Sequence, residues 1–217
     1  VPDPAKASAG ELKQLLCPAV VAELTIDNTG CDRDRRAFFG YRPQNNSDAL
    51  NIRRAKDKLT GIASGQATGI FADDPAVTPA MHFAPHQVLA ERHAFNHNFH
   101  IGRTGLMLCH VPAGKNKTFR FAVCFYRGGV VTTGMPCTYF YSRYYKSLDD
   151  VARSALGSFA WFKRRAKAAD RLLNRKSLSE DQRWMMAHAI RSYFGSTQFL
   201  EHDQKPVWVV NEGEYRM

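Results

Sequence analysis

The sequence predicts an α+β protein in which an antiparallel β-sandwich is followed by helices, with the change near Ser147. Before Ser147, short runs of β-branched and aromatic residues alternate with glycine, proline, asparagine and aspartate, as in sandwiches. After Ser147, apolar residues recur at the spacing of an α-helix. We therefore expect a β-sandwich domain over residues 1–146 and a second, helical domain beginning at residue 147 and continuing to residue 217.

Several segments of the first domain have strand composition. They are Ala19–Ile26, Arg36–Tyr41, Thr104–Val111 and Thr118–Tyr126. Every second residue from Phe119 to Phe125 is aromatic or β-branched, so we expect that set alone to face the core. The stretches 61–69 and 72–79 are rich in glycine, alanine, proline and aspartate and are predicted as loops.

Two helix starts follow the sandwich. Ser147 with Asp150, and Ser179 with Gln182, have the spacing of a helix-capping box. One apolar stripe runs through Leu148, Val151, Ala155, Phe159 and Phe162. After Ser179, the apolar band is wide, which predicts a helix buried on more than one side. A final apolar run, Val207–Val210, predicts a buried strand near the end of the sequence.

Composition excludes several classes of protein. Of the 217 residues, 44% are apolar, which is enough for a core, and no apolar run has membrane-spanning length. The five cysteines are an odd number without a C-x-x-C pair. This argues against a disulfide framework or zinc finger and favours a reducing, cytoplasmic compartment in which the thiols are small buried residues.

The net charge of +10 raises the question of nucleic-acid binding. The densest basic stretch, Phe162–Lys176, is interleaved with alanine and leucine and carries no aromatic–basic recognition motif. We interpret it as a solvated helix face and expect neither a nucleic-acid nor a membrane partner.

The segment Val-Asn-Glu-Gly-Glu-Tyr after the last predicted strand is the strongest candidate site. A carboxylate at a strand end, such as Glu212, can lie on a pocket floor where its surroundings tune its pKa. Glu214, two residues on, points to the opposite side of an extended chain and is unsuited as its catalytic partner. Substrate contacts are predicted for Asn211, Glu214, Tyr215, Arg216 and Trp208. The alternative is an exposed polar turn with Gly213 at positive φ.

Other polar clusters carry weaker signals. His93, His97 and His100 could bind a metal if helical, but neighbouring asparagines and a glycine favour a solvated loop. His188 and Tyr193 are either satisfied core groups or pocket lining. We therefore expect no metal site.

Three blocks together resemble glycoside hydrolase family 52, the β-xylosidases. They are "RFAVCFYRGG" (Arg120–Gly129), "MMAHAIRSYFGSTQFLEH" (Met185–His202) and "KPVWVVNEGEYRM" (Lys205–Met217). The opening "VPDP" and "LTIDNTG" (Leu24–Gly30) also match. The resemblance covers nearly the whole sequence and is weakest from about Asn45 to His100.

The resemblance implies an N-terminal β-sandwich, here partial, followed by an (α/α)6 barrel, so that residues 147–217 would be a linker helix and the first part of that barrel. It implies a retaining β-xylosidase with Glu212 as nucleophile, no cofactor, and an acid/base Asp that no residue here matches. By that comparison both ends of the enzyme are missing, and we expect the fragment alone to be inactive. The implied partner is a xylo-oligosaccharide, and the full enzyme could be a homodimer.

Two other classes remain open at this point. One is a non-catalytic carbohydrate-binding β-sandwich with a helical tail. The other is a basic nucleic-acid-binding protein, whose binding would depend steeply on salt. Neither explains why a tryptophan-bearing strand ends in Asn-Glu-Gly-Glu-Tyr.

Overall fold

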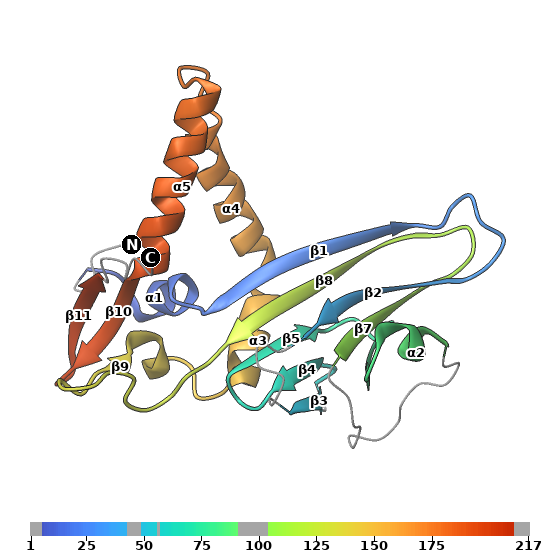
Figure 1. Ribbon diagram of the computed structural model, residues 1–217, viewed down its shortest axis with the longest axis horizontal. Coiled ribbons are helices and arrows are strands. Elements are labelled where there is room, and N and C mark those ends of the chain that lie inside the picture. The colour runs from blue at the N-terminus through green and yellow to red at the C-terminus, as the bar shows by residue number, and fades with distance from the viewer. Residues whose placement is uncertain (1–5, 43–48, 56, 91–103, 211–217) are drawn as a thin grey trace. The chain divides into compact units, whose positions relative to one another are not determined.

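A computed structural model describes residues 6–42, 49–55, 57–90 and 104–210 (Figure 1). The chain forms two compact units. Residues 17–126 and 147–157 form the first, which we call the two-sheet unit; residues 1–16, 127–146 and 158–217 form the second, the hairpin unit. Antiparallel sheets and helices occur in both, which confirms the α+β prediction. The domain limits expected at residues 146 and 147 stay a prediction.

The two-sheet unit contains a five-stranded sheet of order β1-β8-β5-β4-β3 and a three-stranded sheet of order β2-β7-β6. All pairs are antiparallel, as predicted. The strands are β1 (Ala19–Asp27), β2 (Arg35–Tyr41), β3 (Leu50–Arg54), β4 (Thr60–Ser64), β5 (Thr68–Ala72), β6 (Val77–His82), β7 (Thr104–Val111) and β8 (Asn116–Phe125). The helices are α2 (Pro85–Ala90) and α3 (Leu148–Gly157). The predicted strands at β1, β2, β7 and β8 are confirmed.

One hydrophobic core lies between the two sheets. Phe39 of β2 stacks on Phe121 of β8, with ring centroids 5.0 Å apart. Buried members come from both sheets: Leu50, Ile52, Ile62, Ile70, Ala72, Val77, Met81, Met107, Cys109, Val111, Phe119 and Phe121. Alternate residues of each strand enter this core because successive side chains point to opposite faces.

Strand β8 differs from the expected pattern because both of its faces are covered. Phe119 and Phe121 enter the core, as predicted, but Ala122 and Cys124 on the opposite face are also fully buried. The reason is α3, which packs on the outer face of this sheet with its own apolar residues buried. At the strand end, Phe125 is 44% exposed instead of buried.

The loops predicted at 61–69 and 72–79 are wrong over much of their length: the structure places most of β4, parts of β5 and the first half of β6 there, with only short turns between the strands. Glycine occurs in these strands because there is no room for a side chain. A Cβ on Gly61 would lie 2.5 Å from a ring atom of Phe71, and one on Gly69 would lie 2.9 Å from another atom of that ring. The fully buried Phe71 ring therefore requires glycine at both positions, and this packing produced a loop-like composition.

We expect Gly61→Ala to lower the free energy of unfolding by about 3 kcal/mol, because overpacking against a buried ring and a backbone carbonyl cannot relax cheaply. Gly10→Ala is the matched control, since a Cβ there meets nothing within 4 Å. Urea-induced unfolding of both variants measures the difference. Equal stability of the two variants would contradict this packing.

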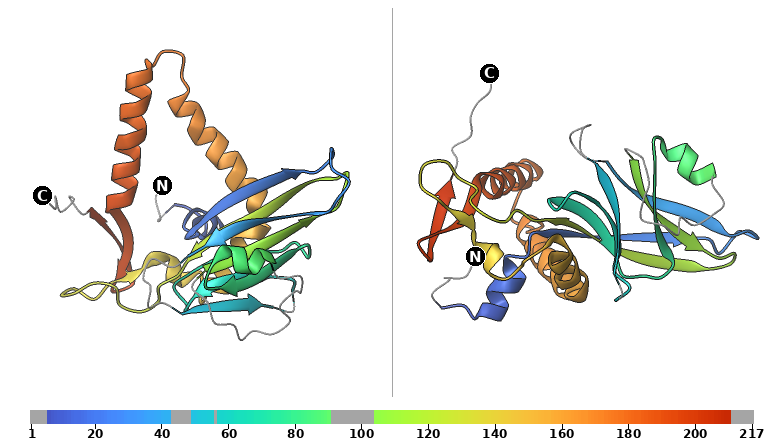
Figure 2. Two further views of the ribbon diagram at one scale, coloured as in Figure 1. Left: turned by 45° about the vertical axis from the view of Figure 1, so that its right-hand side comes forward. Right: turned by 90° about the horizontal axis from the view of Figure 1, so that it is seen from below.

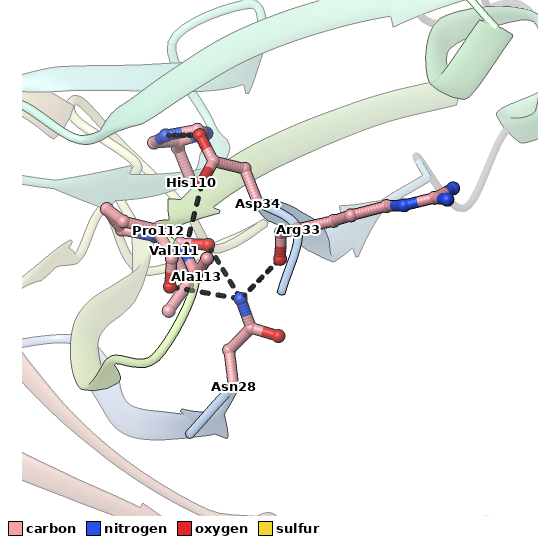
Figure 3. A network of polar contacts seen from close by, with 7 residues as sticks. All are labelled: Asn28, Arg33, Asp34, His110, Val111, Pro112 and Ala113. Carbon is pink, nitrogen blue, oxygen red and sulfur yellow. Dashed lines mark hydrogen bonds and ion pairs between the residues drawn. The ribbon is translucent and has the colours of Figure 1, made fainter. Parts of the chain in front are cut away.

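A buried asparagine closes one end of the two-sheet unit (Figure 3). Asn28, which follows β1, is 1% exposed. Its side-chain Nδ2 donates to the carbonyl oxygens of Arg33, Val111 and Pro112 at 2.9, 3.2 and 3.0 Å. One amide thus joins the β1–β2 connection to the β7–β8 connection, which explains why the Leu24–Gly30 motif contains an asparagine at this position.

Asp34 adds a second link between the same two connections (Figure 3). Its Oδ1 accepts a hydrogen bond from the Ala113 backbone N–H at 3.0 Å, and its Oδ2 lies 3.3 Å from His110 Nε2. Both side chains of the ion pair are more than half exposed, so the buried amide of Asn28 is the stronger element of the closure.

We expect Asn28→Ala to reduce the free energy of unfolding by about 2 kcal/mol, because the buried bond to the Val111 carbonyl and the partly buried bonds to Arg33 and Pro112 are lost together. Asn51→Ala, at an exposed position of β3, is the control and should change little. Thermal or urea unfolding distinguishes the two. If Asn28→Ala unfolds like the control, the amide does not hold the two connections together.

The hairpin unit contains three helices, one 3₁₀ turn and a three-stranded sheet of order β11-β10-β9 among its described residues. Its elements are α1 (Ala9–Leu15), β9 (Thr138–Tyr139), η1 (Phe140–Arg143), α4 (Phe159–Leu173), α5 (Glu180–Ser196), β10 (Thr197–His202) and β11 (Lys205–Val210). Helices α4 and α5 are joined by a short turn and diverge from it (Figure 2). The predicted capping box at Ser179 and Gln182 is confirmed.

The helical region differs from the sequence expectation in two ways. The pattern expected as one helix from Ser147 divides at Ser158 into α3 and α4. Among the residues described in α5, none is buried, and Phe194 is 65% exposed, so the expected burial on more than one side is wrong here. Among the described elements of the hairpin unit, α4 and β10 make the main contacts with α5, and the apolar residues Trp184, Met185, Tyr193 and Phe194 stay largely exposed.

Candidate functional site

The predicted strand at Val207–Val210 is β11, the edge strand of the hairpin formed with β10. Register runs from Thr197 opposite Val210 to His202 opposite Lys205. Asp203 and Gln204 form the turn with φ of 46° and 62°, the left-handed conformation of tight hairpin turns. The strand is half exposed, because one face of an edge strand lacks cover, so the expectation of a buried strand is corrected.

Three aromatic rings hold this hairpin. Trp208 of β11 lies opposite Phe199 of β10, with ring centroids 4.2 Å apart and planes 25° apart. Phe199 in turn stacks on the buried Phe140 of η1 at 4.5 Å. The stack therefore runs from the interior of the unit to the exposed strand that precedes Asn211 and Glu212.

Arg143 fixes the turn of the hairpin. Its Nε donates to the Glu201 carboxylate, and its Nη2 donates to the Gln204 carbonyl at 2.7 Å. Its guanidinium carbon also lies 4.7 Å from the centroid of the Phe140 ring. The hydrogen bond to Glu201 raises the pKa of Arg143, which keeps the guanidinium charged. This one side chain contacts β10, the turn and the aromatic stack.

A pocket of about 460 Å³ lies beside the hairpin. Its lining residues are Leu16, Tyr193, Phe194, Thr197, Phe199 and Trp208. The Thr197 hydroxyl donates to the Tyr193 carbonyl at 2.7 Å, which ties the end of α5 to the start of β10. Aromatic walls of this kind can pack against the C–H face of a sugar ring, and the volume is within the range of ligand pockets.

The described part of the chain contains one of the predicted site residues. Trp208 lines the pocket, while Asn211, Glu212, Glu214, Tyr215 and Arg216 lie outside the described residues. For Tyr193 the sequence left two interpretations open, a satisfied core group or a pocket-lining residue. The structure shows that Tyr193 lines the pocket. The sequence did not lead us to expect Phe194 and Phe199 in a pocket. The local indication was that these two aromatic residues lie on either side of the junction between helix α5 and strand β10.

We also searched the described residues for metal-binding clusters and membrane-spanning helices. His93, His97 and His100 lie outside the described residues. Among the described residues, no cluster of three or more histidine, cysteine, aspartate or glutamate side chains is arranged to hold a metal ion. None of the described helices is long and apolar enough to cross a membrane.

The cysteine thiols are all free, and four of the five are buried, as expected. Burial raises the pKa of Cys109 to about 12. Cys31 is the exception to the expected burial, being partly exposed, and its sulfur accepts a hydrogen bond from Arg35 Nη2 at 3.5 Å.

We expect Arg143→Ala to lower the free energy of unfolding by about 2 kcal/mol, because charge-assisted and backbone hydrogen bonds and the contact with Phe140 are lost together. Arg143→Lys should restore only part of this, since an ammonium lacks the planar fork. The control is Arg171→Ala on the exposed face of α4. Equal melting temperatures of the Arg143→Ala and Arg171→Ala variants would contradict the role of Arg143.

The comparisons with known proteins agree with the resemblance. Two beta-xylosidases of Geobacillus stearothermophilus match all of this chain, one 46% identical over 220 residues and the other 42% identical over 225. The matched part is 31% of the first relative and 35% of the second, so the chain spans about a third of their length. The model of glycosyl hydrolase family 52 matches residues 1–217. The chain therefore belongs to glycosyl hydrolase family 52.

Proposed function

We propose that this chain is part of a retaining β-xylosidase that releases xylose from xylo-oligosaccharides and aryl β-xylosides. The observation that carries the proposal is the hairpin strand β11, which leads directly into Asn-Glu-Gly-Glu-Tyr in a chain 46% identical to a beta-xylosidase. An edge strand anchored by Phe199 and Arg143 is a rigid support for a catalytic carboxylate.

Glu212 is the proposed nucleophile. Its carboxylate attacks the anomeric carbon while a second carboxylic acid, an Asp elsewhere in the enzyme, protonates the departing glycosidic oxygen. The C–O bond to the aglycone breaks and an ester bond to Glu212 forms. Water, deprotonated by the same Asp, then displaces Glu212 and releases xylose with the original configuration. Neither step transfers electrons to an acceptor, so the chemistry calls for no cofactor.

The neighbouring residues would position the sugar. Asn211 supplies an amide for a sugar hydroxyl, and Trp208 and Tyr215 supply rings for its C–H face. Arg216 and Glu214 would set the charge around the nucleophile, because a nearby cation favours the ionised carboxylate. The pocket beside Trp208 supports this arrangement, because it is lined mostly by aromatic rings.

We further propose that residues 147–217 are a linker helix and the first part of the catalytic (α/α)6 barrel, and that later helices of this barrel cover α5. The exposed apolar band of α5 supports this, since apolar surface of that extent normally packs on another element. The length of the relatives, about three times that of this chain, supplies the residues that such a barrel needs.

In the full-length enzyme, Glu212→Ala should reduce turnover of a nitrophenyl β-xyloside by about four orders of magnitude, because the covalent step is lost. Added azide should restore release of nitrophenol and give the α-xylosyl azide, since the small anion enters from the face that the carboxylate vacates. Nuclear magnetic resonance of the product assigns its configuration.

The matched control is Glu180→Ala, which removes an exposed carboxylate in the first turn of α5 and should leave turnover unchanged. A β-configured azide product would make Glu212 the acid/base. Near-normal turnover of Glu212→Ala without azide would remove it from the mechanism altogether.

A further inference from the structure

The outer face of the three-stranded sheet carries a groove of about 600 Å³ in the two-sheet unit. It is lined by Phe38, Gly40, Tyr41, Arg42, Phe83, Ala84, Pro85, Thr104 and Leu106. None of these is among the residues proposed for catalysis. The groove lies on the face opposite the core, because Phe38 and Gly40 alternate with Phe39, which enters the core.

Local structure keeps this groove open. Leu106 forms a buried floor, and Gly40, in the neighbouring strand and opposite Leu106, leaves the space above it empty of side chain. Helix α2 packs on the same face through Val88, which clusters with Ala80 and Leu106. Gly40 is not required by crowding: a Cβ there would meet Leu106 at 3.7 Å, an ordinary contact.

Two phenylalanines stand exposed at this groove. Phe38 is 41% exposed and Phe83 is 60% exposed. Phe83 is held by its backbone N–H, which donates to His82 Nδ1 at 2.9 Å, and by an edge contact with that imidazole. Exposed aromatic rings around a concave apolar floor are uncommon on a protein surface without a ligand or partner.

The polar groups at the groove favour a hydroxylated and partly acidic ligand. Thr104 contributes a hydroxyl and Arg42 a guanidinium to the lining. Arg36, on the same strand face as Phe38, donates to the Leu89 carbonyl at the end of α2 and adds positive charge nearby. Guanidinium groups match carboxylates in geometry and charge. A pentopyranose chain fits this combination, because its rings have C–H faces without a protruding hydroxymethyl group.

We propose that this groove is a saccharide-binding surface that takes a segment of xylan chain, with Phe38 and Phe83 against the sugar rings and Arg42 toward acidic branches of the chain. The choice of xylan as ligand rests on the proposed function. The surface would hold the enzyme on its polymeric substrate, which the exo-acting site alone contacts only at a chain end.

Affinity electrophoresis of the full-length enzyme through gels containing glucuronoxylan tests this. The wild type should be retarded, and Phe83→Ala should weaken the affinity about tenfold through loss of one stacked ring. Gly40→Val should weaken it similarly by filling the groove, since a Cβ at this position meets only ordinary contacts. Phe125→Ala is the control, because Phe125 is also an exposed phenylalanine of the same unit, at 44%, but lies outside the groove.

Parallel arms separate this inference from its alternatives. Neutral arabinoxylan should retard the enzyme less than glucuronoxylan does, and polygalacturonate should not retard it. Equal retardation by polygalacturonate would mean simple charge attraction, and equal behaviour of Phe83→Ala and Phe125→Ala would exclude the groove. A change in oligomeric state on Phe83→Ala, measured by light scattering, would assign the groove to a second copy of the chain and overturn the proposal.

Hydrolysis of a nitrophenyl β-xyloside, measured on the same proteins, should stay within about twofold of wild type in every variant. Loss of a contact to the substrate in the catalytic site would lower turnover by about tenfold, and none of these variants removes such a contact. A loss of that activity in Phe83→Ala would make the groove part of the catalytic site and contradict the proposal. Wild-type hydrolysis without retardation would reject the groove alone, and retardation without hydrolysis would reject the proposed activity.

Discussion

The cross-strand contact between Phe199 and Trp208 is the interaction on which the described end of the chain depends. A two-stranded hairpin is marginal in water unless something packs against it. Here Phe199 connects Trp208 to the buried Phe140, and Arg143 secures the turn at the far end of the ladder. In the sequence, the proposed nucleophile Glu212 follows the last residue of this strand, Val210, by two positions.

The two-sheet unit depends on a different constraint, which is the close approach of neighbouring strands. Phe71 fills the space that Gly61 and Gly69 leave, and Asn28 closes the loops at the end of the unit. Glycine has another effect at Gly40, where the absence of a side chain leaves a groove on the outer face instead of filling the core. Glycine thus allows close packing around Phe71 and leaves an open surface at Gly40.

Local patterns predicted much of the fold. Strand composition identified β2 and β8, alternation assigned a core face to β8, and serine with glutamine three residues later identified the start of α5. The errors came from nonlocal packing: α3 buries the second face of β8, and the Phe71 ring imposes glycines that looked like loop residues. The apolar band of α5 was predicted to be buried but is exposed. An apolar face shows that a helix is suited to packing, but it does not show which element lies beside it.

The candidate site was predictable only where it is contiguous in sequence. Trp208 and the residues around Glu212 form one short motif, and the sequence pointed to them together. Arg143 was not predictable, because its carboxylate partner Glu201 is 58 residues away and nothing local indicates that they meet. The groove at Phe38 and Phe83 was hidden for the same reason, since its walls come from separate strands and a loop.

The most direct test of the account is covalent trapping of the full-length enzyme with a 2-deoxy-2-fluoro-β-xyloside bearing a good leaving group. The fluorine slows hydrolysis of the glycosyl-enzyme, so that the ester accumulates and can be located by peptide mass spectrometry. The account predicts one fluoroxylosyl group per active site, carried by Glu212. A label on any other carboxylate, or inactivation without a covalent adduct, would contradict it.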